Sequence, residues 1–151
     1  MRPFARLGAS RLSPAFRLVG TAALGTTAVV HAWLYVHAGY RQIPTIGPSF
    51  VATVIAATVL GLLVLSYGGG FLVAAAGGFL LSVFGGYVLS ATVGLFGFTE
   101  TGQAIPAVIG GVAEVGGALL FGVGAIRAAA PVRQQPDRSS SRFAPVAKDV
   151  T

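Results

Sequence analysis

Residues 41–100 read RQIPTIGPSFVATVIAATVLGLLVLSYGGGFLVAAAGGFLLSVFGGYVLSATVGLFGFTE, and this stretch decides the fold. Arg41 and Glu100, at its two ends, enclose 58 residues that carry no formal charge. A water-surrounded core in a chain of 151 residues cannot bury an uncharged stretch of this length. We therefore expect lipid, rather than water, to surround much of the chain.

The composition of the whole chain points to the same class of protein. Hydrophobic residues make up 54% of the chain and charged residues 9%, and the mean hydropathy is +0.81. An ordinary soluble domain carries roughly 25% charged residues, so the composition disfavours a soluble globular fold. It also excludes intrinsic disorder in the apolar middle of the chain. The chain contains no cysteine, which excludes disulfides, thiolate metal sites and a cysteine nucleophile.

The apolar sequence divides into four segments, each long enough for a transmembrane helix. A bilayer core of about 30 Å requires roughly 20 apolar residues per helix. The segments are separated by a stretch rich in proline and glycine at 39–48, by three glycines at 68–70 and by a stretch around Glu100. We predict an all-α fold, a transmembrane four-helix bundle over residues 16–127, with spans at about 16–38, 49–67, 71–96 and 105–126.

Basic residues gather at the two ends of the chain, and their distribution predicts the orientation of the spans. Nine of the ten lysines and arginines lie near the first or after the fourth span, and only Arg41 lies in the opposite loops. The positive-inside rule then places both termini in the cytoplasm and the spans in the cell membrane. The net charge of +6 reflects this topology and attraction to anionic lipids, and no nucleic-acid partner is expected. The nine residues are Arg2, Arg6, Arg11, Arg17, Arg127, Arg133, Arg138, Arg142 and Lys148.

The sequence predicts no packed structure for the two flanking segments. Residues 1–15 form a basic cytoplasmic segment, although their arginines and serines, without an acidic residue, also fit a cleaved transit or signal peptide. Residues 128–151 contain three prolines and a run of three serines, and they include too few apolar residues to fold. We predict a disordered basic cytoplasmic tail there.

Small residues recur at every fourth position of the third span. This spacing places them on one face of a helix, and such a face allows close approach of a second helix in lipid. Two interpretations stay open, which are packing within the bundle and association with a second copy or a larger complex. The residues of this small-residue stripe are Gly78, Ser82, Gly86, Ser90 and Gly94.

Four ionisable side chains in the predicted hydrocarbon zone are the informative ones, namely His31, Tyr35, Tyr87 and Glu114. A carboxylate within a bilayer is costly, so Glu114 is expected to face the bundle interior and to have a partner there. With a rise of 1.5 Å per residue, His31, Tyr87 and Glu114 lie roughly 10 to 14 Å below the outer edge, and Tyr35 lies one turn above His31. The cluster predicts either a proton relay or ligand site, or a hydrogen-bonded clamp between helices.

Cofactor chemistry finds little support in the sequence. His31 and His37 are six residues apart, or about 240° around a helix, so one helix cannot present both to one haem iron. No HExxH motif, paired aspartates or phosphate-binding loop lysine is present. We predict no cofactor and no metal site, and we identify no catalytic residue.

The outer segment at 39–48 reads GYRQIPTIGP and is the most motif-like part of the chain. Together with His31 and Glu114 it resembles small four-span integral membrane proteins of GC-rich bacteria that carry a Gly-Tyr-Arg-x-Ile-Pro-Thr-Ile-Gly segment. The resemblance covers about residues 18–126 and implies a bundle fold, and it implies no substrate.

Arg41 and Glu100 are the charges of the two predicted outer loops. One interpretation is an exposed ion pair that closes the outer face, with a contribution of about 0 to 1 kcal/mol. The other is a shallow outward site in which Arg41 meets an anionic lipid headgroup or a partner, with Tyr40 and Trp33 as interfacial anchors.

These observations leave three classes of function. The small-residue stripe and the lack of a catalytic motif favour a protein that acts by association, as an accessory subunit or a homo-oligomer. The second hypothesis is a small proton-linked transporter or ligand-binding membrane protein that uses the intramembrane cluster. An enzyme is the third and the least favoured hypothesis.

Overall fold

The computed structural model describes residues 12–100 and 105–129, and within them it contains four α-helices, one short 3-10 helix and no β-strand. Each α-helix has 21 to 25 residues and is apolar enough to cross a membrane, which confirms the predicted all-α architecture and marks a multi-pass membrane protein. The elements are α1 (Pro14–His37), η1 (Tyr40–Gln42), α2 (Ile46–Ser66), α3 (Gly70–Thr92) and α4 (Ile105–Ala129).

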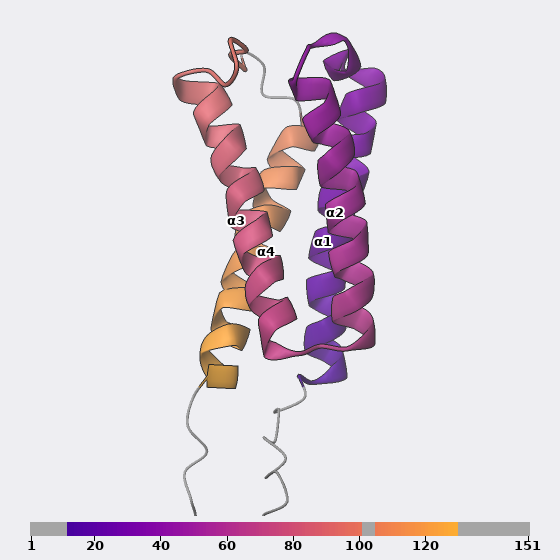
Figure 1. The fold of residues 1–151 in the computed structure, drawn as a ribbon, viewed down its shortest axis with the longest axis vertical. Coiled ribbons are helices and arrows are strands. Elements are labelled where there is room, and N and C mark those ends of the chain that lie inside the picture. Colours follow the sequence, from indigo (N-terminus) through magenta and orange to yellow (C-terminus); the bar gives the residue numbers. More distant parts are fainter. Residues whose placement is uncertain (1–11, 101–104, 130–151) are drawn as a thin grey trace, which may run out of the picture.

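The four helices run up and down, with the start of α1 and the end of α4 at the same end of the bundle (Figure 1). The most extensive contacts join α1 to α2 and α3 to α4, and α1 also packs along α4. Contacts between α2 and α3 are much sparser. We call the end that holds the start of α1 the inner end, and the opposite end, with η1, the outer end.

The N-terminal ends of α1 and α2 show how local chemistry sets the helix starts. The Ser13 hydroxyl accepts a hydrogen bond from the Phe16 N–H at 3.2 Å, and Pro14 occupies the first turn of α1. The second helix begins at Ile46, three residues before the predicted start. Pro48 lies in the first turn of α2, where the backbone N–H groups lack helical partners, so a proline is tolerated there and does not delay the helix.

The third helix ends at Thr92, so the predicted end of that span at residue 96 is wrong. Gly94 has a φ of +88° and Gly97 a φ of +79°, a backbone conformation that glycine adopts without strain and that ends a helix. Leu95 and Phe98 then pair in a tight turn through two backbone hydrogen bonds. Gly94 therefore lies outside α3 and does not extend the small-residue stripe.

The apolar core fills the inner half of the bundle. Phe121 of α4 lies at its centre, against Gly20 of α1 and Gly77 of α3. A Cβ atom at Gly20 would lie 2.6 Å from the Phe121 ring, so only glycine allows this helix approach. The other fully buried members of the core are Leu24, Val64, Val73, Ala76 and Leu80.

Several predictions concern residues outside the described ranges. These are the basic N-terminal segment as far as residue 11, with its alternative as a cleaved peptide, and the disordered tail from residue 130 on. Arg17 and Arg127 are the described members of the basic set, and they lie near the inner end of the bundle.

Candidate functional site

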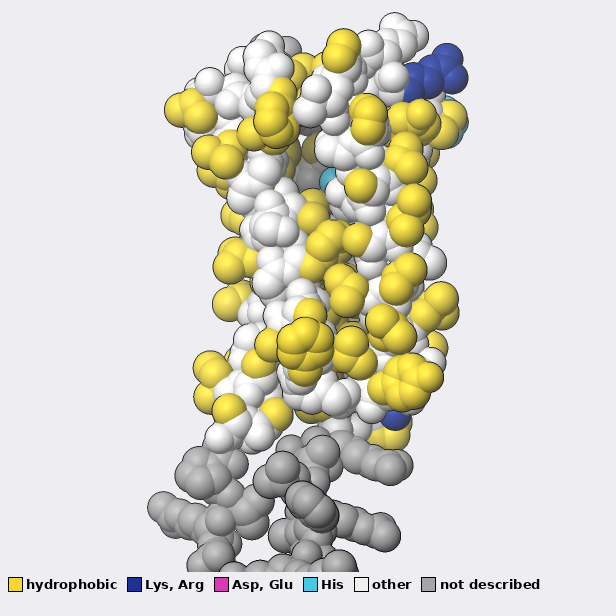
Figure 2. Space-filling view, viewed as in Figure 1, with side chains coloured by type: hydrophobic (Ala, Val, Ile, Leu, Met, Phe, Trp, Pro, Cys, Tyr) yellow, Lys and Arg dark blue, Asp and Glu magenta, His cyan; other side chains and the backbone are white. Residues whose placement is uncertain are grey.

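A cavity of about 310 Å³ occupies the outer half of the bundle, above the apolar core. All four helices and η1 contribute to its lining, and it lies where α2 and α3 make few contacts. Figure 2 shows the hollow between these two helices, with a histidine side chain visible inside it. This position makes the cavity accessible from the side of the bundle.

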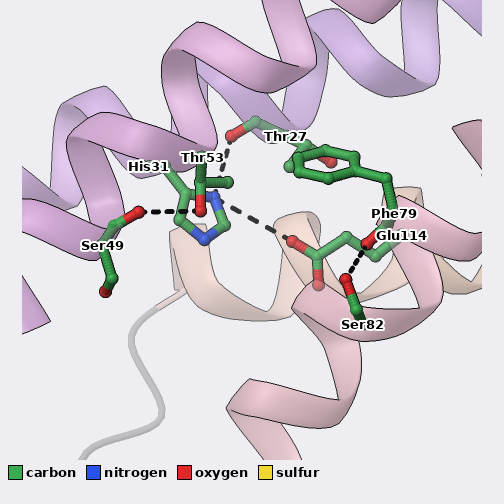
Figure 3. A network of polar contacts seen from close by, with 7 residues as sticks. All are labelled: Thr27, His31, Ser49, Thr53, Phe79, Ser82 and Glu114. Atoms are coloured by element: carbon green, nitrogen blue, oxygen red, sulfur yellow. Dashed lines mark hydrogen bonds and ion pairs between the residues drawn. The ribbon is translucent and has the colours of Figure 1, made fainter.

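His31 of α1 and Glu114 of α4 face each other at this cavity (Figure 3). The His31 Nδ1 atom lies 2.9 Å from the backbone oxygen of Thr27 and 4.0 Å from Glu114 Oε1. A carbonyl oxygen can only accept, so Nδ1 carries a hydrogen and donates it to Thr27. The separation of 4.0 Å is too long for a hydrogen bond, so the carboxylate and the imidazole are neighbours without a direct hydrogen bond.

The burial of this pair is nearly complete. The His31 side chain is 12% exposed and the Glu114 side chain 3%. Among the described residues, no side chain or backbone group donates a hydrogen bond to Glu114. A buried carboxylate without hydrogen bonds is energetically costly, which is typical of a functional group rather than of a structural one.

Four hydroxyl groups that line the cavity point their hydrogens away from it. Each donates to a backbone oxygen three or four residues earlier in its own helix, at distances of 2.7 to 2.9 Å. The lone pairs of these oxygens stay available, so they can accept further hydrogen bonds. The four residues are Ser49, Thr53, Ser82 and Ser90.

Aromatic rings connect the outer rim of the cavity to His31. The Tyr40 ring stacks on Phe50, with ring centroids 4.7 Å apart, and meets the edge of Phe98 at 5.7 Å. Phe50 in turn lies 4.9 Å from the His31 ring. These contacts cover one wall of the cavity with π-systems.

At the rim, the Tyr40 hydroxyl donates a hydrogen bond to Glu100 Oε2. Burial, and next the acidic neighbour Glu100, raise the pKa of the Tyr40 phenol above its ordinary value. The sequence offered an exposed ion pair between Arg41 and Glu100 as one interpretation. In the structure the Tyr40 phenol contacts Glu100, and Arg41 is exposed.

The structure brings together three of the four predicted intramembrane polar residues. His31, Tyr87 and Glu114 all line the cavity, whereas Tyr35 does not. The Tyr87 ring packs near Phe84, with ring centroids 6.4 Å apart. Sequence reasoning missed Phe50, Phe79 and Phe98 as lining residues. For Phe50 and Phe79, an aromatic residue in an apolar span gives no signal that separates a cavity wall from a lipid-facing surface, and Phe98 lies in the predicted loop after the third span.

The small-residue stripe does not provide the main packing face of α3. A Cβ atom added at Gly78 or Gly86 would meet nothing within 4 Å, whereas one added at Gly77 would lie 3.1 Å from Phe121 Cβ. Ser82, Gly86 and Ser90 instead line the cavity. Their small size leaves the space open.

The described residues contain no group of three or more side chains suited to hold a metal ion. No protein-family model matches this chain, and no curated protein or solved structure matches it either. The fold and the cavity therefore define a four-helix membrane protein with a laterally accessible, largely apolar site that contains a carboxylate, and its function is argued from that site alone.

Proposed function

We propose that this protein is a ligand-binding membrane protein and that the cavity in its outer half is the binding site. The observation that carries the proposal is Glu114, a carboxylate that is 3% exposed, lines the cavity and accepts no hydrogen bond from a described residue. A polar group of a ligand would supply the missing interaction. The rings on the cavity wall would hold the apolar part of the same ligand.

The geometry of the pair supports binding over a purely structural clamp. The hydrogen-bonded clamp between α1 and α4 requires a direct hydrogen bond, and the 4.0 Å separation of His31 Nδ1 and Glu114 Oε1 does not provide one. Nδ1 is instead committed to Thr27, within the same helix. The side chains of both residues thus retain capacity for a third group.

The orientation of the site follows from the proposed topology. We place the protein in the cell membrane with both termini in the cytoplasm, a placement supported by Arg17 and Arg127 near the inner end. The cavity then lies in the half of the membrane that faces away from the cytoplasm. Reactivity of terminal tags in intact and in opened cells tests this orientation.

The binding test uses 2-phenylethanol, which combines an aromatic ring with one hydroxyl donor. Gly86→Leu adds a side chain to the cavity lining at a position where a Cβ atom would meet nothing within 4 Å. Gly85→Leu on the same helix is the matched control, because a Cβ atom there also meets nothing and Gly85 does not line the cavity. In lipid nanodiscs we expect saturable binding to the wild type and to Gly85→Leu, and none to Gly86→Leu. Equal partitioning into all three and into empty nanodiscs would contradict the function.

Association is a second candidate function, favoured by one observation. Gly78 is exposed on α3 with open space around it, so the backbone of another helix could approach there. A homo-oligomer or a complex with a larger membrane protein would use this surface. Native mass spectrometry from mild detergent tests it, and a strictly monomeric particle without a partner would exclude it.

A further inference from the structure

The charges that line the cavity have one dominant sign. Glu100 lies at the rim and Glu114 at depth, and no lysine or arginine is found among the described lining residues. His31 contributes at most one positive charge. With Glu114 ionised and His31 neutral, the deep part of the lining is therefore negative, although the chain as a whole has a formal net charge of +6.

The hydrogen-bonding capacity of the lining has the same bias. The four lining hydroxyls donate to their own helices, and the Tyr40 hydroxyl donates to Glu100, so these oxygens offer lone pairs to a ligand. Glu114 offers only acceptor oxygens when it is ionised. An anionic ligand would meet repulsion here, whereas a positively charged ligand would meet complementary groups.

The aromatic wall suits an organic cation rather than a small inorganic one. The rings of Tyr40, Phe50 and Phe98 contact one another and line the cavity, and aromatic side chains suit the apolar groups of an organic cation. A cavity of about 310 Å³ is far larger than a metal ion requires, and the described residues hold no cluster of three metal ligands. The lateral access between α2 and α3 favours a ligand that partitions into lipid.

We propose that the cavity binds a hydrophobic organic monocation, with the Glu114 carboxylate as its counter-ion and the rings of Tyr40 and Phe50 against its apolar part. This inference rests on the ligand-binding function proposed above and names the class of ligand. Glu114 supplies the charge recognition.

The experiment compares three probes of similar shape in nanodiscs of uncharged lipid. The probes are the cation benzyltrimethylammonium, its neutral isostere neopentylbenzene and the anion phenylmethanesulfonate. We expect the cation to bind more than about tenfold more tightly than either of the others, because losing one partner of a buried charge pair costs more than this factor. Glu114→Gln should remove the preference, and Gly86→Leu should abolish binding, while Gly85→Leu should bind as the wild type does.

The outcomes separate this inference from the proposed function. If 2-phenylethanol binds in a manner blocked by Gly86→Leu, but the cation binds no better than its neutral isostere, the cavity is a ligand site and the inference of a cation is wrong. If no probe binds, both are wrong. If circular dichroism and thermal unfolding show that Glu114→Gln does not fold, the affinities of the three probes for the wild type are decisive. Tightest binding of the cation supports the inference, and any other order contradicts it.

Discussion

The Tyr40 hydroxyl and the Glu100 carboxylate join the segment before α2 to the segment after α3, on the outer rim of the cavity. This hydrogen bond spans 60 positions of the sequence and links two helices that otherwise share few contacts. It therefore helps to fix the width of the cavity at its outer end. The same phenol stacks on Phe50, so one side chain combines a polar tie with an aromatic wall.

Removal of the Tyr40 hydroxyl should loosen the outer end of the bundle. Tyr40→Phe keeps the ring stack on Phe50 and deletes the donor to Glu100, and we expect the free energy of unfolding to fall by about 1 kcal/mol. Thermal unfolding in detergent or nanodiscs measures the change. Tyr67→Phe is the control, since Tyr67 is 72% exposed at the inner end and should be neutral. Equal effects of the two substitutions would refute a role for the hydrogen bond.

Titration of the Tyr40 phenol should make the free energy of unfolding depend on pH in the alkaline range. Burial and the adjacent Glu100 raise the pKa of Tyr40 in the folded protein, whereas an unfolded tyrosine titrates near about pH 10. The contribution of Tyr40 to the free energy of unfolding is therefore fully present below about pH 10. It is lost as the pH rises further, because the unfolded chain then releases a proton that the folded chain retains. We expect this alkaline loss of stability to be smaller in Tyr40→Phe. If the free energy of unfolding falls equally steeply with pH above about pH 10 in both proteins, the loss does not arise from Tyr40.

The hydroxyl of Thr27 provides a test of packing beside the site. It is fully buried and has no hydrogen-bond partner among the described residues, although the Thr27 backbone oxygen accepts from His31. Thr27→Val keeps the shape and removes the unsatisfied hydroxyl, so the protein should become more stable by about 1 kcal/mol. Thermal unfolding measures the difference, and a clear loss of stability would mean that the hydroxyl has a partner in the membrane.

The length and spacing of the apolar segments sufficed to predict four helices, because a bilayer imposes a minimum length on any uncharged span. The proximity of His31 and Glu114 was also predictable, since depth in the membrane follows from counting residues along straight helices. The packing face of α3 could not be predicted from the sequence. Gly77 and Gly78 are adjacent, and sequence alone cannot tell which of the two meets Phe121, because the rotation of a uniformly apolar helix is set by its neighbours. The cavity wall was missed for the same reason.

The rotation of α3 can be tested with these adjacent glycines. Gly77→Leu forces a side chain toward Phe121 Cβ, 3.1 Å from the position of the new Cβ, and overpacking of this kind costs about 1 to 3 kcal/mol. Gly78→Leu enters open space and should leave the unfolding temperature unchanged. If Gly78→Leu were the more damaging of the two, the small-residue stripe would be the packing face after all.

The absence of cysteine allows the charge preference of the cavity to be measured by chemical labelling. A single cysteine introduced by Ser82→Cys lies on the cavity wall, and one introduced by Gly85→Cys on the same helix does not. Cationic and anionic methanethiosulfonate reagents react with the same thiolate, so the ratio of their rates reports the local potential and not the reactivity of the sulfur. An acidic cavity focuses the electric field. The ratio of the cationic to the anionic labelling rate should therefore be at least about tenfold higher at position 82 than at position 85. Adding Glu114→Gln should lower the ratio at position 82 toward that at position 85, because a neutral amide then replaces the deeper carboxylate. Equal ratios in the absence of that substitution would show that the cavity does not select positive charge.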